Sequence, residues 1–234
     1  MRAWRSTLML LCLAFAAPAQ AEAVRYALDP VHTRVMFTVS HAGFSNAIGT
    51  VSGSTGELWF DAEDWRSARL SARVPIARTD LGDAKWNEAT LARNLLDAET
   101  HPEASFVSTR IEPRDATHAT VFGDLTLRGV TREVALDVTL NAAKRHPMPP
   151  FRRTVGFSAT TVLSRKDFGI TAWSSMIGDA VELRIEAEAT RARGGADASD
   201  AAPSEPAPEA IESTEPAPAS EDTPSPTSNV EPTP

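Results

Sequence analysis

Cysteine is almost absent from this chain. The only one among 234 residues is Cys12, which lies in an apolar run near the N-terminus. We expect that run to be removed, and the mature chain then has no cysteine. Disulfide bonds, thiol catalysis and zinc sites built on thiolates are thereby excluded together. Stability must come from a hydrophobic core, for which a domain of about 170 residues is large enough.

The sequence also lacks a surplus of positive charge. Its formal net charge is −8 at pH 7, and this charge is unevenly distributed. Residues 22–193 carry 21 basic and 22 acidic side chains, whereas residues 194–234 carry nine acidic side chains and no basic one. A protein that binds nucleic acid needs a dense cationic face, which neither region provides. We therefore expect no nucleic-acid partner.

Residues 1–21 have the features of a secretory signal peptide. Arg2 and Arg5 give a cationic start, Leu8–Ala17 is an apolar run, and residues 19–21 (Ala-Gln-Ala) fit the small-residue cleavage rule. The run is shorter than the roughly 20 apolar residues that span a bilayer. A retained membrane anchor is the alternative interpretation. We predict cleavage after residue 21, export, and no stable membrane anchor in the mature chain.

The C-terminal segment 194–234 has a different composition. Nine of the 17 prolines fall in it, and Ile211 and Val230 are its only large apolar residues. Such a segment cannot bury enough apolar surface to offset the entropy lost on ordering its backbone. We predict a disordered acidic tail, rich in Pro, Ala and Glu, that serves as a solubilising spacer. Tethering to a cationic partner or to cell-wall material is the alternative.

Residues 22–193 alternate between apolar and polar side chains. In the first clear segment, Val35, Phe37 and Val39 share one face with Val31, and the intervening polar residues share the other. This period of two is typical of half-buried strands. It recurs in residues 57–61, 69–76, 106–109, 120–128, 133–140, 154–160 and 181–186. About eight short strands separated by turn residues indicate an antiparallel barrel or sandwich rather than a parallel α/β sheet.

One helix is expected between these strands. Asp80 or Asp83 can cap its N-terminus, and apolar residues follow helical spacing from Leu81 to about Leu96. Glycines at positions 43, 49, 53 and 56 follow the first clear strand. They predict a bulged or strongly curved segment there, which closure of a barrel requires.

Motifs that carry chemistry are missing. No pair of histidines has metal-binding spacing, and there is no nucleophile elbow, P-loop or dinucleotide-binding loop. His32 and His41 are nine residues apart, which puts them on opposite faces of a regular strand. We interpret His32 as a structural histidine held by Asp29 or by a backbone carbonyl. The residues alone thus indicate an exported all-β domain with apolar inner faces and no recognisable catalytic motif.

Five segments carry a more specific pattern. They are residues 26–33 followed by Phe37 and His41, residues 101–109, residues 123–131, residues 164–169 and residues 178–181. In order and spacing, over about residues 24–190, they resemble the YceI-like family of periplasmic, lipocalin-like polyisoprenoid-binding proteins. Two departures matter for the shape of a pocket and the polarity of its rim. Residues 95–97 (Leu-Leu-Asp) stand where the family often has aromatic residues before the Asp, and Lys166 replaces a small polar residue.

The resemblance implies an extended eight-stranded antiparallel lipocalin-like barrel over residues 22–193, with one short helix between strands. It also implies a periplasmic location and a ligand in the bore, namely a long apolar amphiphile of the polyisoprenoid or isoprenoid quinone class. The hydrocarbon chain of such a ligand binds by apolar burial, which contributes about 25 cal/mol per Å² of surface removed from water. Neither a catalytic motif nor a cofactor is then needed.

Apolar residues of the alternating strands and of the segment after them are the candidate ligand contacts. They are Val35, Phe37, Val39, Phe106, Leu125, Leu127, Leu136, Val138, Phe157, Trp173 and Ile177. The alternative is that they simply fill a closed core. If the ligand has a charged head, the candidate rim cations are Arg128, Arg132, Arg165 and Lys166. Solvated surface charge is the alternative for those four.

Three functions follow from these expectations. The preferred one is a periplasmic protein that carries, stores or sequesters a lipid, and that is not an enzyme. The second is a structural or stress-response protein with a dry core that acts through a protein partner. The third is an enzyme acting on a bound lipid, which would require His32, Asp29 and Asp167 to cluster around a cleft. Barrels of this kind can pair as homodimers, although no exposed apolar stripe in the sequence demands it.

Overall fold

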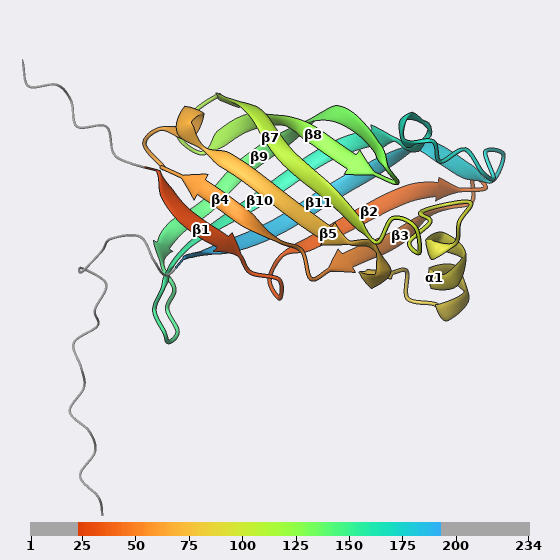
Figure 1. Ribbon diagram of the computed structural model, residues 1–234, viewed down its shortest axis with the longest axis horizontal. Coiled ribbons are helices and arrows are strands. Elements are labelled where there is room, and N and C mark those ends of the chain that lie inside the picture. Colours follow the sequence, from red (N-terminus) through yellow and green to blue (C-terminus); the bar gives the residue numbers. More distant parts are fainter. Residues whose placement is uncertain (1–22, 193–234) are drawn as a thin grey trace, which may run out of the picture. The chain divides into compact units, whose positions relative to one another are not determined.

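The computed structural model describes residues 23–192. The predicted signal peptide and the predicted acidic tail lie outside the described residues. Within them, eleven strands form one antiparallel sheet that closes on itself (Figure 1). The strands are β1 (Val24–Leu28), β2 (Arg34–His41), β3 (Ser45–Ser52), β4 (Thr55–Phe60), β5 (Arg69–Pro75), β6 (Thr79–Asp80), β7 (Glu103–Pro113), β8 (His118–Leu127), β9 (Val130–Arg145), β10 (Arg153–Ser164) and β11 (Ile177–Arg191).

The closed ring contains eight of these strands. Its order is β1-β4-β5-β7-β8-β9-β10-β11, and β1 pairs again with β11. β2 continues along β11 beyond β1, β3 pairs with β2, and β6 pairs with β3. The pairs β1/β2, β4/β3 and β5/β6 therefore act as three interrupted strands. The expected eight-stranded antiparallel barrel is confirmed.

Turn residues cause the interruptions. Between β1 and β2, the Asp29 carboxylate accepts a hydrogen bond from the backbone N–H of Val31 at 2.8 Å. Between β3 and β4, Gly53 adopts a φ of +80°, which an L side chain rarely adopts. The chain leaves β5 through the 3₁₀ turn η2 (Ile76–Arg78). The strand that the sequence placed from Val31 thus begins at Arg34, and Val31 is exposed.

The glycine-rich segment after β2 lacks the bulge that was one of the two predicted features. β3 pairs with β2 in unbroken register from Ser45 to Ser52, without a bulge. Gly49 lies opposite Phe37, and a Cβ atom at Gly49 would overlap the Phe37 ring. The glycine therefore makes room for an aromatic ring on the neighbouring strand, which the sequence pattern did not distinguish from a bulge.

The helix α1 (Ala84–Leu91) is present but ends earlier than predicted. Asp83 caps it by accepting from the backbone N–H groups of Lys85 and Trp86 at 3.0 and 3.1 Å. The chain leaves the helix at Ala92, and the N–H of Leu96 turns back to the carbonyl of Thr90. This turn satisfies the end of the helix and places the next segment against the barrel. Two leucines of that segment pack on a buried cluster of Leu163, Phe168 and Ile170.

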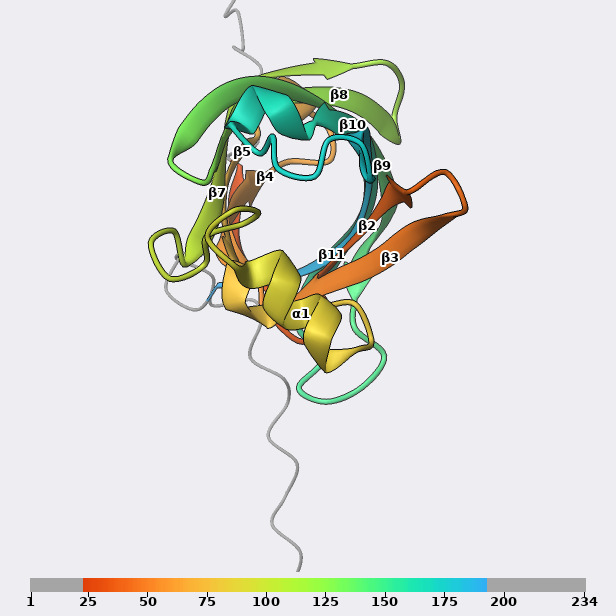
Figure 2. The same cartoon turned by 90° about the vertical axis from the view of Figure 1, so that its right-hand side faces the viewer.

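The two ends of the barrel differ. At what we call the aromatic end, Phe60, Trp65 and Phe157 meet edge to face, with ring centroids 5.2–6.1 Å apart. Trp65 belongs to the 3₁₀ turn η1 (Trp65–Ser67). The opposite end, here the helix end, carries α1 and the 3₁₀ turn η3 (Arg165–Phe168), which lie across it from one another (Figure 2).

Candidate functional site

The barrel encloses a cavity of about 480 Å³. Side chains from all eight strands of the ring contribute to its wall, which extends from Phe60 and Trp65 to α1. Trp86 of α1 lines the cavity and is also 41% exposed, so the cavity reaches the surface beside this helix. Its volume is in the usual range for small-molecule sites, about 300–1,000 Å³.

Ten of the eleven predicted contact residues lie on the cavity wall, since alternation along a strand turns every second side chain inward. They are Val35, Phe37, Val39, Phe106, Leu125, Leu127, Leu136, Val138, Phe157 and Ile177. Trp173 does not. It is 61% exposed in a turn where its φ is +56°, and it is not part of the wall. Trp173 lies in none of the alternating segments that predicted strands, and its side chain faces solvent.

The wall also contains residues that sequence reasoning missed. Ala47 and Val51 face inward from β3, where the period of two was hidden by Gly49 between them. Other residues reach the cavity from the helix end, where the helical spacing of residues 81–96 predicted a helix but not which side chains turn toward the bore. These are Leu81, Trp86, Leu95, Leu96, Phe168 and Ile170.

The wall of the cavity carries almost no charge. Among the described residues that line it, only His41 and Arg165 are ionisable, and neither an acidic side chain nor a tyrosine is present. The His41 ring packs against Trp86, with centroids 5.2 Å apart. Enzymes that catalyse hydrolysis or group transfer usually use a pair of carboxylates or a nucleophile with its general base. The wall is suited to holding an apolar molecule.

Arg165 is not a free cation at the rim. It is 5% exposed, and its guanidinium donates to the carbonyls of Gly178, Ile170, Ala172 and Ile177 at 2.8–2.9 Å. Burial lowers its pKa, and nearby Asp179 opposes that shift. The predicted head-group role for Arg165 is therefore corrected. Its hydrogen bonds fix the segment between η3 and β11, which borders the cavity.

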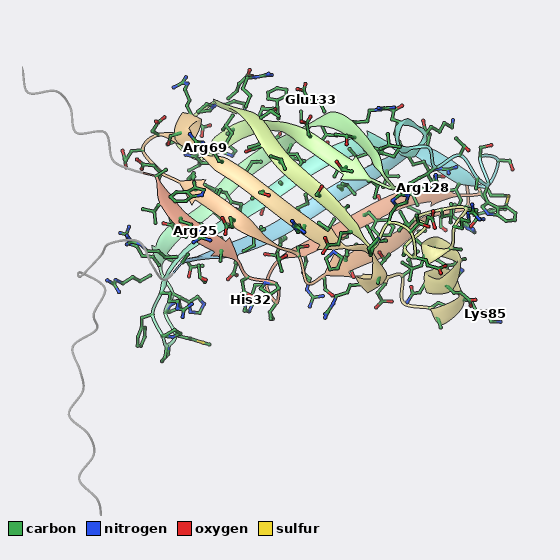
Figure 3. The ribbon with its side chains drawn as sticks, viewed as in Figure 1. Arg25, His32, Arg69, Lys85, Arg128 and Glu133 are labelled. Carbon is green, nitrogen blue, oxygen red and sulfur yellow. The ribbon has the colours of Figure 1, made fainter. Side chains whose placement is uncertain are left out.

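Arg128 also holds the backbone of the helix end together. It lies with Gly129 in the two-residue turn between β8 and β9, where both have positive φ angles of 52° and 74°. Its guanidinium donates to the carbonyls of Gly169 and Arg93 at 3.0 and 2.9 Å. Figure 3 shows Arg128 at the helix end, close to the loops that it joins. This turn belongs to residues 123–131, the most specific of the recognised segments.

The other two rim candidates lie outside the cavity. Arg132 is exposed on β9 and donates to the carbonyl of Thr131 at 3.0 Å. Lys166 is exposed, and its Nζ lies 3.9 Å from Asp179 Oδ2. Burial of Asp179 alone would raise its pKa, but hydrogen bonds from the Lys166 backbone and Ser164 outweigh it, so the pKa is lowered. Neither cation lines the cavity.

His32 has the structural role that the sequence predicted. Its Nδ1 lies 2.8 Å from Asp29 Oδ2 in the turn before β2, and its side chain is exposed. The hydrogen bond that the His32 ring donates to Asp29, followed by the charge of that carboxylate, raises the pKa of His32. Burial of Asp29 opposes ionisation, but the hydrogen bonds that it accepts from His32 and Val31 prevail and lower its pKa.

The structure does not bring Asp167 to this pair. Asp167 lies in η3, directly after Ser164, which pairs with Ala180 of β11. The backbone N–H of Asp29, in contrast, donates to the carbonyl of Glu188, further along the same strand. Eight residues of strand separate the two points by about 25 Å. Figure 3 likewise shows His32 away from the helix end. The cluster that an enzymatic function required is therefore not formed. Within residues 23–192, no group of three or more His, Cys, Asp or Glu side chains could hold a metal ion.

Comparisons with known proteins agree with this architecture. Residues 26–189 match the model of the YceI-like domain. A UPF0312 protein of Ectopseudomonas mendocina is 32% identical over 174 residues, which cover 74% of this chain and 90% of that protein. Burkholderia cenocepacia BcnA superposes with a TM-score of 0.62 at 23% identity, covering 69% of this chain and 98% of BcnA. A polyisoprenoid-binding domain from Saccharophagus degradans gives 0.55 at 13% identity, over 72% and 99% of the two chains.

Proposed function

Since this chain belongs to the YceI-like family, we propose that it is a non-enzymatic lipid-binding protein. Its ligand is a long apolar amphiphile of the polyisoprenoid or isoprenoid quinone class, held in the bore for carriage, storage or sequestration. The observation that carries this proposal is the cavity of about 480 Å³ with its almost uncharged wall. A dry, completely packed core would have favoured the alternative function through a protein partner.

Apolar burial is sufficient to hold such a ligand. At about 25 cal/mol per Å², covering about 400 Å² of a lipid chain contributes about 10 kcal/mol before the costs of immobilisation. The fold relative from Saccharophagus degradans is described as a polyisoprenoid-binding domain, which supports this ligand class. The wall supports it as well, because it offers branched aliphatic and aromatic side chains along the length of the bore.

We place the protein in the periplasm. The support is the signal-like composition of residues 1–21, with its cationic start, apolar run and small-residue cleavage site. Among the residues that the structure describes, no helix is long and apolar enough to cross a membrane. To test this location, the chain is expressed with and without residues 1–21 and the cells are fractionated. Only the form that carries these residues should reach the periplasm.

Mass spectrometry of protein purified from the periplasm tests the ligand directly. The native mass is compared with the denatured mass, and the organic extract is analysed. We expect a stoichiometric polyprenyl or quinone species. A mass without ligand, combined with failure to bind added lipid, would instead favour the function through a protein partner.

Substitutions at the cavity wall test the site. Leu127→Trp places a large ring in the bore and should weaken lipid binding at least tenfold, because it occupies ligand volume. Val162→Trp is the matched control, since Val162 is 63% exposed and does not line the cavity. Unchanged binding by a folded Leu127→Trp variant would contradict the assignment of the bore as the site.

A further inference from the structure

Four polar side chains are buried in the part of the chain that the structure describes, and all of them line the cavity. Arg165 is one of these, and four of its five N–H donors are occupied by carbonyls at the helix end. The other three are the hydroxyl residues Thr33, Ser54 and Thr79, which are 2–4% exposed. We call these three the hydroxyl belt.

The hydroxyl belt follows the interruptions of the barrel wall. Thr33 precedes β2, Ser54 joins β3 to β4, and Thr79 begins β6. Thr79 pairs with Val51 of β3, and Arg34, next to Thr33, pairs with Ser52 of the same strand. The three hydroxyl residues therefore lie at one level, on neighbouring strand positions, where regular pairing is broken.

Only one member of the belt has an unused donor. The Thr79 hydroxyl donates to the carbonyl of Ile76 at 2.7 Å, and the Thr33 hydroxyl donates to the carbonyl of Glu188 at 3.3 Å. Ser54 Oγ has no hydrogen-bond partner among the described residues, although Ser54 is 2% exposed. A buried hydroxyl without a partner is unfavourable, and because Ser54 lines the cavity, a rotation of its side chain lets a group in the cavity satisfy it.

The charge of the cavity restricts what that group is. The only ionisable residues on the wall, His41 and Arg165, belong to the helix end, and the Arg165 donors face backbone carbonyls. Arg34 and Arg78 lie next to the belt, but both are exposed and neither lines the cavity, so a phosphate buried at the belt would have no compensating cation on the wall and would be strongly unfavourable. An uncharged oxygen needs only a hydrogen bond, and the belt provides one donor and several acceptor lone pairs.

We propose that Ser54 is the hydrogen-bonding anchor of the bore, and that the ligand carries an uncharged oxygen, as an alcohol or a carbonyl, which accepts from Ser54 Oγ. An alcohol can in addition donate to a threonine oxygen of the belt. This inference rests on the proposed function, because it requires a lipid in the bore. It makes the belt one determinant of which lipids bind tightly, separate from the other unpartnered donor on the described wall, Trp65 Nε1 at the aromatic end.

The experiment compares three ligands that share one chain. Delipidated protein is titrated with geranylgeraniol, with geranylgeranyl pyrophosphate and with the corresponding hydrocarbon that lacks oxygen, by displacement of a fluorescent lipid probe. The wild type should bind the alcohol about tenfold more tightly than the hydrocarbon, as one buried hydrogen bond allows. It should bind the pyrophosphate more weakly than the alcohol.

Three variants isolate the contribution of the hydroxyl. In Ser54→Ala the alcohol and the hydrocarbon should bind with equal affinity, whereas Ser54→Thr, which keeps a hydroxyl, should retain the preference. Ser52→Ala is the matched control, because Ser52 lies only two residues away, at the end of β3, but does not line the cavity. The Tm of Ser54→Ala should equal or exceed that of the wild type, since no hydrogen bond within the protein is lost.

The outcomes separate this inference from the proposed function. Equal binding of alcohol and hydrocarbon by the wild type, or a preference that persists in Ser54→Ala, overturns the role of Ser54 and leaves the cavity as a lipid site. Tighter binding of the pyrophosphate than of the alcohol overturns the proposed ligand class. Failure of all three ligands to bind the wild type overturns the proposed function, and this inference with it.

Discussion

The aromatic end and the helix end of the barrel are built on the same alternating strands, but different forces hold them. At the aromatic end, rings pack edge to face, and Phe60 and Val155 are 3% and 1% exposed. At the helix end, arginine side chains hold loops in place by donating to backbone carbonyls. Apolar packing therefore stabilises the aromatic end. The helix end has its own buried cluster of Leu163, Phe168 and Ile170, but charged hydrogen bonds in addition keep its loops ordered around the entrance to the cavity.

Two tryptophans provide the strongest test of this comparison. Trp65→Ala at the aromatic end removes a side chain that is 5% exposed and contacts two other rings, so it should lower the free energy of unfolding by about 3–5 kcal/mol. Trp173→Ala at the helix end removes one that is 61% exposed and should change it by less than about 0.5 kcal/mol. Urea denaturation measures both, and similar losses would contradict the comparison.

Arg165→Met tests the hydrogen bonds of the helix end. It leaves four carbonyls without their donor, and we expect a loss of about 2–3 kcal/mol in the free energy of unfolding. Amide exchange should accelerate in residues 169–178 and stay slow in β10. Lys166→Met, next to it in η3 but exposed, should cost less than about 0.5 kcal/mol. Uniform acceleration throughout the barrel would show that Arg165 has no local role.

Two glycines sharpen the comparison within the wall itself. Gly49→Ala would force the Phe37 ring to move, and it should lower the free energy of unfolding by about 1–2 kcal/mol. Gly156→Ala, near the aromatic end, adds a methyl group to open space and should be neutral or slightly stabilising. Thermal melts distinguish the two, and a neutral Gly49→Ala would mean that the wall yields easily there.

The smallest expected effect concerns pH and lies at neither end. The folded state raises the pKa of His32, so its contribution is complete below the unfolded value of about 6.5 and is lost as pH rises through the folded pKa. The folded state lowers the pKa of Asp29, so the contribution of this carboxylate to the free energy of unfolding is lost only as the pH falls into the acid range. The Tm difference between wild type and His32→Gln should be larger at pH 5 than at pH 8. An equal difference at both values would exclude ion pairing by His32.

Alternation predicted most of the strands because it follows directly from burying one face. It placed Leu125, Leu136 and Val138 on what proved to be the cavity wall. It failed where backbone geometry matters more than periodicity. The turn at Asp29 and Pro30 separates β1 from β2 along one edge of β11. Gly49 leaves space for the Phe37 ring and does not form a bulge.

The chemistry of the site was harder to read from sequence than its shape. Arg165 carries the same charge as Lys166, and nothing local shows that one is buried among carbonyls while the other faces solvent. Ser54 gave no signal, because its importance depends on a partner that it lacks in the folded barrel. Such properties arise only when distant segments come together.

The seam that closes the ring has a consequence for folding. Tyr26 of β1 pairs with Arg191 of β11, which lies at the other limit of the described chain. Most other pairs within the ring join strands that are consecutive in sequence and can form as local hairpins, whereas β2 and β3 lie between β1 and β4, and helix α1 lies between β5 and β7. The seam must overcome the entropy of closing one very long loop, and such topologies fold on the slow side, over milliseconds to seconds. As long as β11 is not paired with β1, the inner faces belong to an open sheet, so the enclosed cavity depends on this seam.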